Sequence, residues 1–338
     1  MTIELPVLHL GLAGFSSGEQ EGLAALLPSV ARGHMVWEFE RLTEADAWWI
    51  NGARAKLLAG GTVRVAAAVP TERALQLHLP DIDRPVAFSL PLACPDLAPN
   101  LSFDIAVPSS IGAVLDKFEA WLSPLTAQFC LASHIVEHET ALGSGAFEVR
   151  LEGRLLAVVD LHGDIGVLPG AGPADFENAE WRRCAAVRIP EDLVRTSMSQ
   201  LMWQYSLRTQ RDLLPRHYRT GLLYFRRPPR LPHRLLRDSH LLLMRELAVS
   251  PGTFEGLQSS TGLHPLQLAR DLASLYFVGA ITSNPKRAAP GSLLRRPDAA
   301  ELDLPSGLPS GLDSEPGRDA ERKLPPSDLT APAPMGPS

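Results

Sequence analysis

Long apolar runs and cysteines are both scarce in this sequence. Its 338 residues include three cysteines, Cys94, Cys130 and Cys184, which lie far apart and form no CxxC pair. An odd, dispersed set of this kind excludes a disulfide framework and a zinc ribbon and is typical of a reducing compartment. No apolar run reaches the roughly 18 to 20 residues of a membrane span, and no basic stretch precedes the first run. We therefore expect a cytoplasmic protein with no membrane partner.

Common catalytic motifs are missing as well. There is no GxSxG elbow and no cysteine in a recognisable catalytic setting, so nucleophilic catalysis has no support. GLAGFSSGE follows the first apolar strand, but Gly11, Gly14 and Gly18 do not have the GxGxxG spacing that lets backbone approach a pyrophosphate. The sequence shows no repeat of fixed period. We expect no cofactor and no enzyme activity.

The charge that is present is unevenly distributed. An apolar content of 45% lets two or three domains bury cores of ordinary size. The formal charge of -6 conceals a segment between Arg208 and Arg237 that holds nine arginines and a single acid, Asp212. Because the remainder of the chain is acidic, this segment is a candidate for binding an anionic partner.

Residues 5–92 alternate between short apolar strands and helical stretches. We expect strands at 7–15, 34–42, 45–50, 62–69 and 85–90, and a helix at 17–31 with Ser16 or Ser17 as its cap. Strands that alternate with helical connections predict a doubly wound parallel sheet with helices on both faces. The predicted class for residues 1–95 is therefore α/β, with a flavodoxin-like sheet of five parallel strands.

Asn51 ends the third of these strands, five residues after Asp46. The strand order and this spacing resemble the receiver domain of bacterial response regulators, in which an aspartate on the third strand accepts phosphate. The resemblance implies an acidic pair after strand one to hold Mg²⁺, a hydroxyl after strand four and a lysine after strand five. At those places the sequence has, in order, Ala13 to Ser17, Ala67 with Ala68, and Leu90 with Pro91. We therefore expect a pseudo-receiver in which Asn51 marks a degenerate phosphoacceptor position. An unrelated flavodoxin-like or Rossmann-like domain is the alternative.

The apolar period changes after a proline-rich connection at 92–100. A helical stretch at 110–133, three short strands at 146–169 and a helix at 190–211 predict a middle α+β domain over 96–235, ending in a basic helix and linker. Helices at 240–250, 253–261 and 264–279, with a turn at Gly262, resemble a winged helix over 236–284 with at most a rudimentary hairpin. Residues 285–338 are rich in proline, glycine and serine, which predicts a disordered tail.

The basic segment supplies the candidate phosphate ligands. Arginine beside aromatic side chains grips phosphate and stacks on bases, and the segment places Arg226, Arg227, Arg230 and Arg234 near Tyr224 and Phe225. A nucleic acid or a cyclic dinucleotide would fit. The spacing of Arg226 and Arg230 resembles half of a cyclic-di-GMP-binding PilZ motif, without its DxSxxG partner. The alternative is that the arginines pair with acidic surfaces of the other domains.

The last predicted helix could also contribute to a nucleic-acid interface. Its apolar spacing predicts that one face exposes His264, Gln267, Arg270, Asp271 and Ser274. Gln267 and Arg270 could reach base edges, whereas Asp271 would oppose phosphate. Many winged helices dock proteins instead, and that use fits this helix equally well.

HIVEH, from His134 to His138, matches the HxxEH motif, in which two histidines one helical turn apart bind zinc and the glutamate activates water. The predicted helix ends within a few residues, and no second helix offers an obvious third ligand. A solvated helix end explains the same residues.

The sequence therefore favours a non-catalytic bacterial signalling protein that docks to a partner protein. A winged-helix transcription regulator that binds DNA through its arginines is the first alternative, and a zinc hydrolase at His134 and His138 is the second. The sequence leaves the partner, the oligomeric state and any ligand of the middle domain open.

Overall fold

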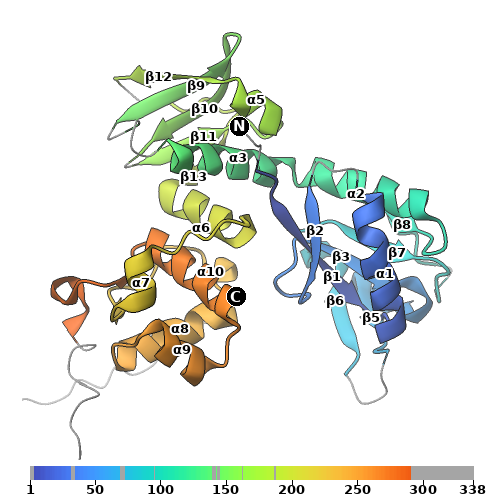
Figure 1. Cartoon of the computed structure of the whole chain (residues 1–338). Helices are drawn as coiled ribbons and strands as arrows, with labels where there is room; N and C mark the ends of the chain where they lie inside the picture. Colours follow the sequence, from blue (N-terminus) through green and yellow to red (C-terminus); the bar gives the residue numbers. More distant parts are fainter. Residues whose placement is uncertain are drawn as a thin grey trace, which may run out of the picture. The chain divides into compact units, whose positions relative to one another are not determined.

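Five parallel strands form the first sheet of the computed structural model (Figure 1). The structure describes residues 4–290 except 32–34, 69–72, 95, 139–141, 143–144, 162 and 186–187, and these residues belong to one unit, Met1–Pro297. The predicted disordered tail lies almost wholly outside the described residues. The strands are β1 (Val7–Ala13), β2 (Val36–Glu40), β3 (Ala47–Asn51), β7 (Val86–Ser89) and β8 (Ser102–Phe103).

The order of these strands is β2-β1-β3-β7-β8. Counted as the strands occur along the chain, this order is 2-1-3-4-5, which is compatible with a flavodoxin-like core. The predicted five-stranded parallel sheet is thus confirmed. The receiver-like assignment stays a prediction.

Helices cover one face of the parallel sheet. α1 (Ser17–Val30) and α2 (Pro108–Trp121) pack on side chains such as Leu8, Leu10 and Trp49. Ser16 caps α1 as predicted, and Glu19 completes a capping box that satisfies the exposed backbone N–H groups of the first turn. Because α2 belongs to this layer, the layer continues beyond residue 95, where we expected the first domain to end.

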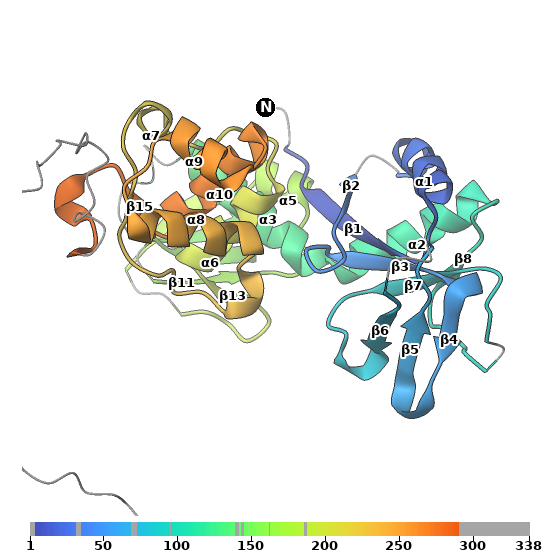
Figure 2. The ribbon, with the colours of Figure 1, turned by 90° about the horizontal axis from the view of Figure 1, so that it is seen from below.

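The other face of the sheet is covered by strands. β4 (Ala55–Leu57), β5 (Thr62–Val65) and β6 (Leu75–His78) form a three-stranded antiparallel sheet, which lies on the side opposite α1 in Figure 2. Its inner side chains, including Val63 and Val65, join one core with Ile50 and Phe88 of the parallel sheet. The predictions of helices on both faces and of a fourth parallel strand at 62–69 are therefore wrong. The fourth parallel strand is β7.

Residues 41–46 connect β2 to β3, which lie on either side of β1. This connection crosses β1 at Gly11, where an added Cβ would lie 2.9 Å from Leu42 Cδ1 and 3.0 Å from Ala45 Cβ. Only glycine leaves room for such an approach. The crossing brings Asp46, the last residue of the connection, to a buried position beside His9, whose backbone N–H donates to Asp46 Oδ2 at 3.0 Å.

The middle part consists of a second sheet and the helices on it. The antiparallel order is β12-β9-β10-β11-β13. The predicted three-stranded meander is present as the three central strands, while the outer two were not predicted. Val194–Ser197 is a strand where we expected the start of a helix. The elements are α3 (Ser123–Glu137), β9 (Ala146–Leu151), β10 (Arg154–Asp160), β11 (Asp164–Val167), α5 (Pro173–Glu177), β12 (Glu180–Cys184), β13 (Val194–Ser197) and α6 (Met198–Arg208).

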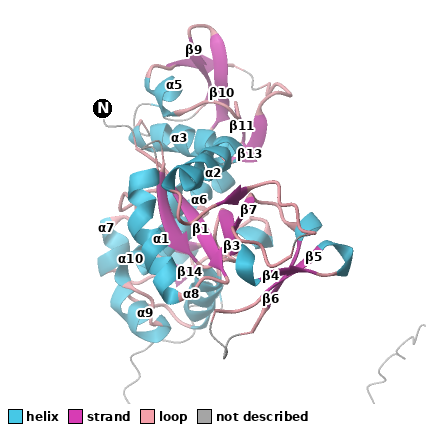
Figure 3. Ribbon diagram, turned by 90° about the vertical axis from the view of Figure 1, so that its right-hand side faces the viewer, coloured by secondary structure: helices cyan, strands magenta, loops and turns pink. Residues whose placement is uncertain are grey.

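The three predicted C-terminal helices are present within about two residues of their expected ends, and Figure 3 shows them grouped with α7. Gly262 makes the turn between the last two with a left-handed φ of 68°. The strand before the helices pairs with the strand after them, and no hairpin follows α10 within the described residues, so the winged helix stays a prediction. The elements are α7 (Arg216–Thr220), β14 (Tyr224–Phe225), α8 (Asp238–Val249), α9 (Phe254–Thr261), α10 (Pro265–Phe277) and β15 (Ile281–Thr282).

Candidate functional sites

At the carboxyl end of the parallel sheet, the polar side chains are engaged in hydrogen bonds with neighbouring residues. Asn51 is buried; its Oδ1 accepts from the N–H of Ala53 at 3.1 Å and its Nδ2 donates to Glu19 Oε1 at 3.3 Å. Ser89, beside it in register, accepts at Oγ from the N–H of Gly52 at 3.1 Å. These side chains hold the turn that follows β3. Asn51, the last residue of β3, thus caps the turn, and its assignment as a degenerate phosphoacceptor position stays a prediction.

Ser89 is a residue that the sequence reasoning missed. Because β7 is the fourth parallel strand, the hydroxyl expected at the end of strand four is Ser89, and the expectation of alanines at that place is wrong. The remaining receiver groups are still lacking. Asp104, and not a lysine, follows the fifth strand. Glu19, whose Oε1 accepts from Asn51, also accepts from Ser16 N–H and Oγ, and mainly the N–H of Ser16 lowers the pKa of its carboxyl.

Buried and half-buried ion pairs join the first part of the chain to the rest, and arginines of the basic segment supply them. Arg208 pairs with Asp46, and both side chains are less than a tenth exposed. Burial alone would raise the pKa of the Asp46 carboxyl, but the Arg208 guanidinium and then His9 hold it well below its usual range. Arg237 contacts Glu44 at 3.3 Å in the same way.

Glu4 is the centre of a second set of contacts with the same segment. Its Oε2 accepts from Tyr205 Oη at 2.8 Å and Ser133 Oγ at 2.9 Å, and lies 3.1 Å from Arg211 Nε. Its Oε1 accepts from Thr209 Oγ1. For Arg208, Arg211 and Arg237, pairing with acidic groups elsewhere in the chain is thus what the structure shows.

The four arginines predicted to bind phosphate behave differently. Within the described ranges, Arg226, Arg227, Arg230 and Arg234 make no ion pair. Arg226 and Arg227 come together at the turn after α10, because a Cβ built on Gly279 would lie 3.2 Å from Arg226 Nη1 and 3.5 Å from Arg227 Nη2. Arg234 lies elsewhere, in a pocket that Glu44 and Asp46 also line.

The predicted stacking residues lie in β14. Tyr224 is half-buried, and Phe225 packs against the core of the C-terminal helices. Whether either ring stacks on a base stays a prediction.

Most of α10 is buried, so the predicted exposure of Asp271 and Ser274 is wrong. Ser274 Oγ lies 2.8 Å from Ser206 Oγ of α6, which covers this face. Asp271 Oδ1 lies 3.3 Å from His240 Nε2, and both side chains are fully buried. Burial raises the pKa of Asp271 to about 6, and burial, followed by Arg237, lowers the pKa of His240 to about 3.

The start of α10 is the part of this helix that is most exposed to solvent. His264 and Gln267 are exposed and Arg270 is half-buried. All three line a pocket with Glu40 and Glu44, which come from the first part of the chain. Arg41 and Arg237 line this pocket too, and Arg237 pairs with Glu44, so the pocket carries charges of both signs. Whether Gln267 and Arg270 read DNA bases stays a prediction.

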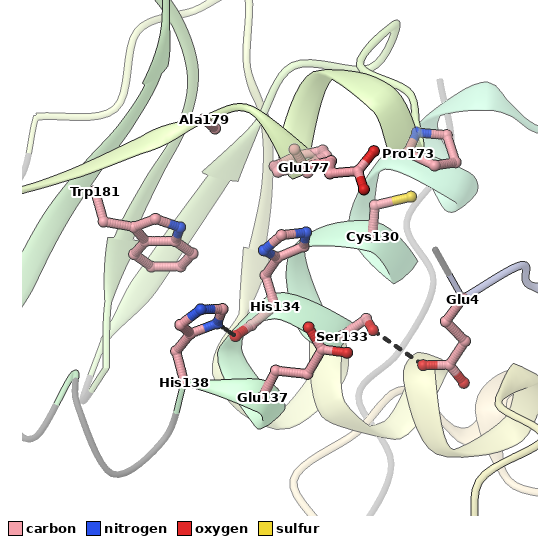
Figure 4. A pocket seen from close by; sticks show the side chains of 11 residues that line it. Glu4, Cys130, Ser133, His134, Glu137, His138, Pro173, Glu177, Ala179 and Trp181 are labelled. Carbon is pink, nitrogen blue, oxygen red and sulfur yellow. Dashed lines mark hydrogen bonds between the residues drawn. The ribbon is translucent and has the colours of Figure 1, made fainter. Parts of the chain in front are cut away.

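His134 and His138 lie at the C-terminal end of α3, in a pocket of about 120 Å³ shown in Figure 4. Their rings stack in parallel, with centroids 5.8 Å apart. His138 Nδ1 lies 3.0 Å from the carbonyl oxygen of His134. Burial lowers the pKa of the His134 imidazole.

Carboxylates complete this pocket. Glu137 lies between the two histidines in sequence, and its Oε1 accepts from Arg211 at 2.6 Å. Glu177 of α5 lines the same pocket but does not belong to the cluster of ligand groups around the two histidines. One ligand atom from each of His134, Glu137 and His138 lies within 4.8 Å of the others, and no other such trio occurs in the part of the chain that the structure describes.

Comparison with protein-family models, with curated proteins and with solved structures gives no match to this chain. No helix among the described residues is long and apolar enough to cross a membrane. The sites themselves are therefore the basis on which a function can be proposed.

Proposed function

We propose that this chain is a non-catalytic regulatory protein that docks to an acidic surface of a partner protein through the unpaired arginines of its basic segment. The receiver-like first domain serves in this proposal as a scaffold that cannot accept phosphate. The observation that carries the proposal is the division of the nine arginines between Arg208 and Arg237 into a paired and an unpaired group.

The paired group has a structural role. Arg208, Arg211 and Arg237 contact acids of the first domain, and Arg219 contacts Asp212 at 2.7 Å. The remaining five have no ion-pair partner in the described parts of the chain; they are Arg216, Arg226, Arg227, Arg230 and Arg234. In a chain of net charge -6, cations without internal partners attract an oppositely charged surface and speed its association.

At two candidate ligand sites the polar side chains are engaged by the protein itself, which supports a non-catalytic role. The carboxyl end of a flavodoxin-like sheet is where such folds bind ligands, and here Asn51 and Ser89 are engaged by neighbouring backbone N–H groups. The face of α10 that carries Asp271 and Ser274 is packed inside the protein. Both sites are thus used to hold the fold together.

Nucleic acid is the second candidate partner, because the same arginines could contact phosphates. Such binding would be largely independent of sequence, because contacts to phosphates position a protein on the duplex but carry no sequence information. Affinity would then fall steeply with salt, whereas a protein partner would depend on the shape of its surface as well as on charge.

The experiment places a photo-reactive amino acid at exposed His233, next to the unpaired arginines, and maps crosslinks in living cells. We expect one discrete protein adduct that Arg226→Glu with Arg230→Glu abolishes. Arg154→Glu is the matched control, because Arg154 is an exposed arginine on β10 that makes no ion pair within the described chain; it should leave the adduct unchanged.

A titration with random-sequence duplex DNA at low and physiological salt completes the test. Tight, salt-steep binding that the double variant weakens would favour the nucleic-acid candidate. An adduct that survives the double variant, or that the Arg154 control removes equally, would overturn the proposal of docking through these arginines.

A further inference from the structure

We infer that His134, Glu137 and His138 bind one divalent transition-metal ion of the zinc class. The inference concerns binding and is independent of the arginine surface. It starts from the helix: residues four apart lie on one face, so α3 places the two imidazoles side by side at its last turn. Imidazole and carboxylate are the ligand types that zinc takes in such sites.

The hydrogen bond of His138 prepares it for this role. Its Nδ1 lies 3.0 Å from the carbonyl oxygen of His134, and a carbonyl oxygen can only accept, so Nδ1 carries the proton. The lone pair of the neutral ring then lies on Nε2. A ring nitrogen bonded to a backbone carbonyl is the outer contact that orients metal-binding histidines. His134 makes no side-chain hydrogen bond to any described residue, so its ring is free to supply a second nitrogen.

The third ligand is Glu137. Its Oε1 accepts from Arg211, which leaves Oε2 for a metal ion. This use differs from the HxxEH hydrolase, in which the glutamate acts on water. Ligands at about 2.0 to 2.2 Å from a tetrahedral ion lie roughly 3.3 to 3.6 Å apart, so the three groups, now within 4.8 Å of one another, must draw together by about an ångström.

The surroundings favour a cation. The last carbonyl groups of α3 carry the negative end of the helix dipole. Glu4 and Glu177 line the same pocket as Glu137, and Arg211 is the one arginine that contacts these carboxylates in the described chain. Phe176 and Trp181 supply apolar walls that limit access of water. Glu177 lines the pocket outside this trio of ligands, so water would take the fourth position.

Metal binding at this site would affect the contacts that join the first domain to α6. Arg211 joins Glu137 to Glu4, whose carboxylate also accepts from Tyr205 and Thr209 of α6 and its C-cap. A metal ion that draws Glu137 toward the histidines changes the position of Arg211's partner. The site is thus a means by which metal availability could alter the contact between the first domain and α6.

The test titrates Zn²⁺ into the purified, metal-free full chain in competition with a chromophoric chelator. We expect one ion per chain. His134→Gln and His138→Gln should each weaken binding by about 100-fold or more, and Glu137→Gln by about tenfold, since even outer contacts of metal sites change affinity by 10- to 100-fold. His233→Gln, at an exposed histidine of η4 (His233–Leu235), is the control and should leave affinity within about twofold.

A second measurement distinguishes the loss of metal binding from misfolding of the variants. Zn²⁺ should raise the Tm of the wild-type chain and of His233→Gln, because a ligand of the folded state alone stabilises it. The Tm of His134→Gln should not rise, while its far-ultraviolet circular dichroism should match the wild type. A wild-type chain that binds no Zn²⁺ at 1:1, or histidine variants that bind as tightly as the wild type, would overturn the inference.

Discussion

Asp46→Asn tests whether the parts of the chain are held together by a buried ion pair. Asp46 and Arg208 are 9% and 8% exposed, so water screens their attraction little. Removing one partner of a buried pair costs about 3 to 5 kcal/mol, because the other charge stays buried without compensation. The asparagine oxygen can still accept from His9 N–H, and Arg208 keeps its bond to the Gln204 carbonyl at 3.2 Å. We therefore expect a loss of about 3 kcal/mol, near the lower limit.

The assay is urea unfolding at pH 7 with a matched carboxylate-to-amide control. Glu180 pairs with Arg182 at 2.6 Å, but both side chains are more than 60% exposed, so Glu180→Gln should cost less than about 1 kcal/mol. Adding Arg208→Gln to Asp46→Asn should give a coupling energy of about 2 kcal/mol. If Asp46→Asn cost no more than Glu180→Gln, the proposed role of the pair would be refuted.

The pH dependence gives a second check of the same pair. The pKa of Asp46 is lower in the folded chain than in the unfolded chain. The pair therefore contributes its full stability above the unfolded pKa near 4, and the contribution is lost as the pH falls from there toward the folded pKa. Asp46→Asn should make the acid side of the stability profile shallower, and a profile of unchanged slope would contradict this reasoning.

Two further predictions concern the carboxyl end of the parallel sheet. Asn51→Asp should not be phosphorylated by a small phosphodonor with Mg²⁺, because Glu19 is engaged by Ser16 and no lysine follows the fifth strand; a phosphoprotein detected by mass spectrometry would show that a metal site had been missed. Gly52→Ala should cost about 3 kcal/mol or more in urea unfolding, because its Cβ would collide with the Ser89 carbonyl oxygen, whereas Gly18→Ala, with nothing within 4 Å, should be neutral or slightly stabilising; equal stabilities would contradict the close approach of the turn after β3 to the end of β7.

Local signals predicted local structure well. Ser16 and Glu19 form the capping box that their spacing indicates, and Gly262 makes the left-handed turn between α9 and α10. The first three parallel strands lie where their apolar runs place them. Each of these features depends on side chains within a few residues of one another, which is why the sequence was sufficient.

Features that depend on distant partners were not predictable in the same way. TVRV alternates apolar and polar residues, which fits an antiparallel strand as well as a parallel one. Only its pairing with β4 and β6 determines that the strand is antiparallel. β8 has two residues, too few for any period to be visible. As a result, Ser89 was not recognised as the residue that ends the fourth parallel strand.

The candidate sites show the same difference between local features, which the sequence predicts, and features that depend on distant residues, which it does not. The spacing of His134 and His138 predicted that they share a helix face, but Glu177 and Arg211 reach that place from other elements. The polar residues Asp271 and Ser274 suggested a solvent face of α10. They are buried because α8 and α6 supply His240 and Ser206 opposite them, and such a partner leaves no trace in the spacing of α10 itself.

α6 takes part in two cores and one ion pair at once. Leu201 and Tyr205 pack with the second sheet, whereas Trp203 and Leu207 pack with the C-terminal helices. Arg208, the last residue of α6, pairs with Asp46, which precedes β3 of the parallel sheet. The chain therefore lacks the modularity that its succession of sheet and helix motifs suggests: a cut before α6 opens the core of the second sheet, and a cut after it opens the helical core. Neither neighbour of α6 could be transplanted intact without taking this helix along.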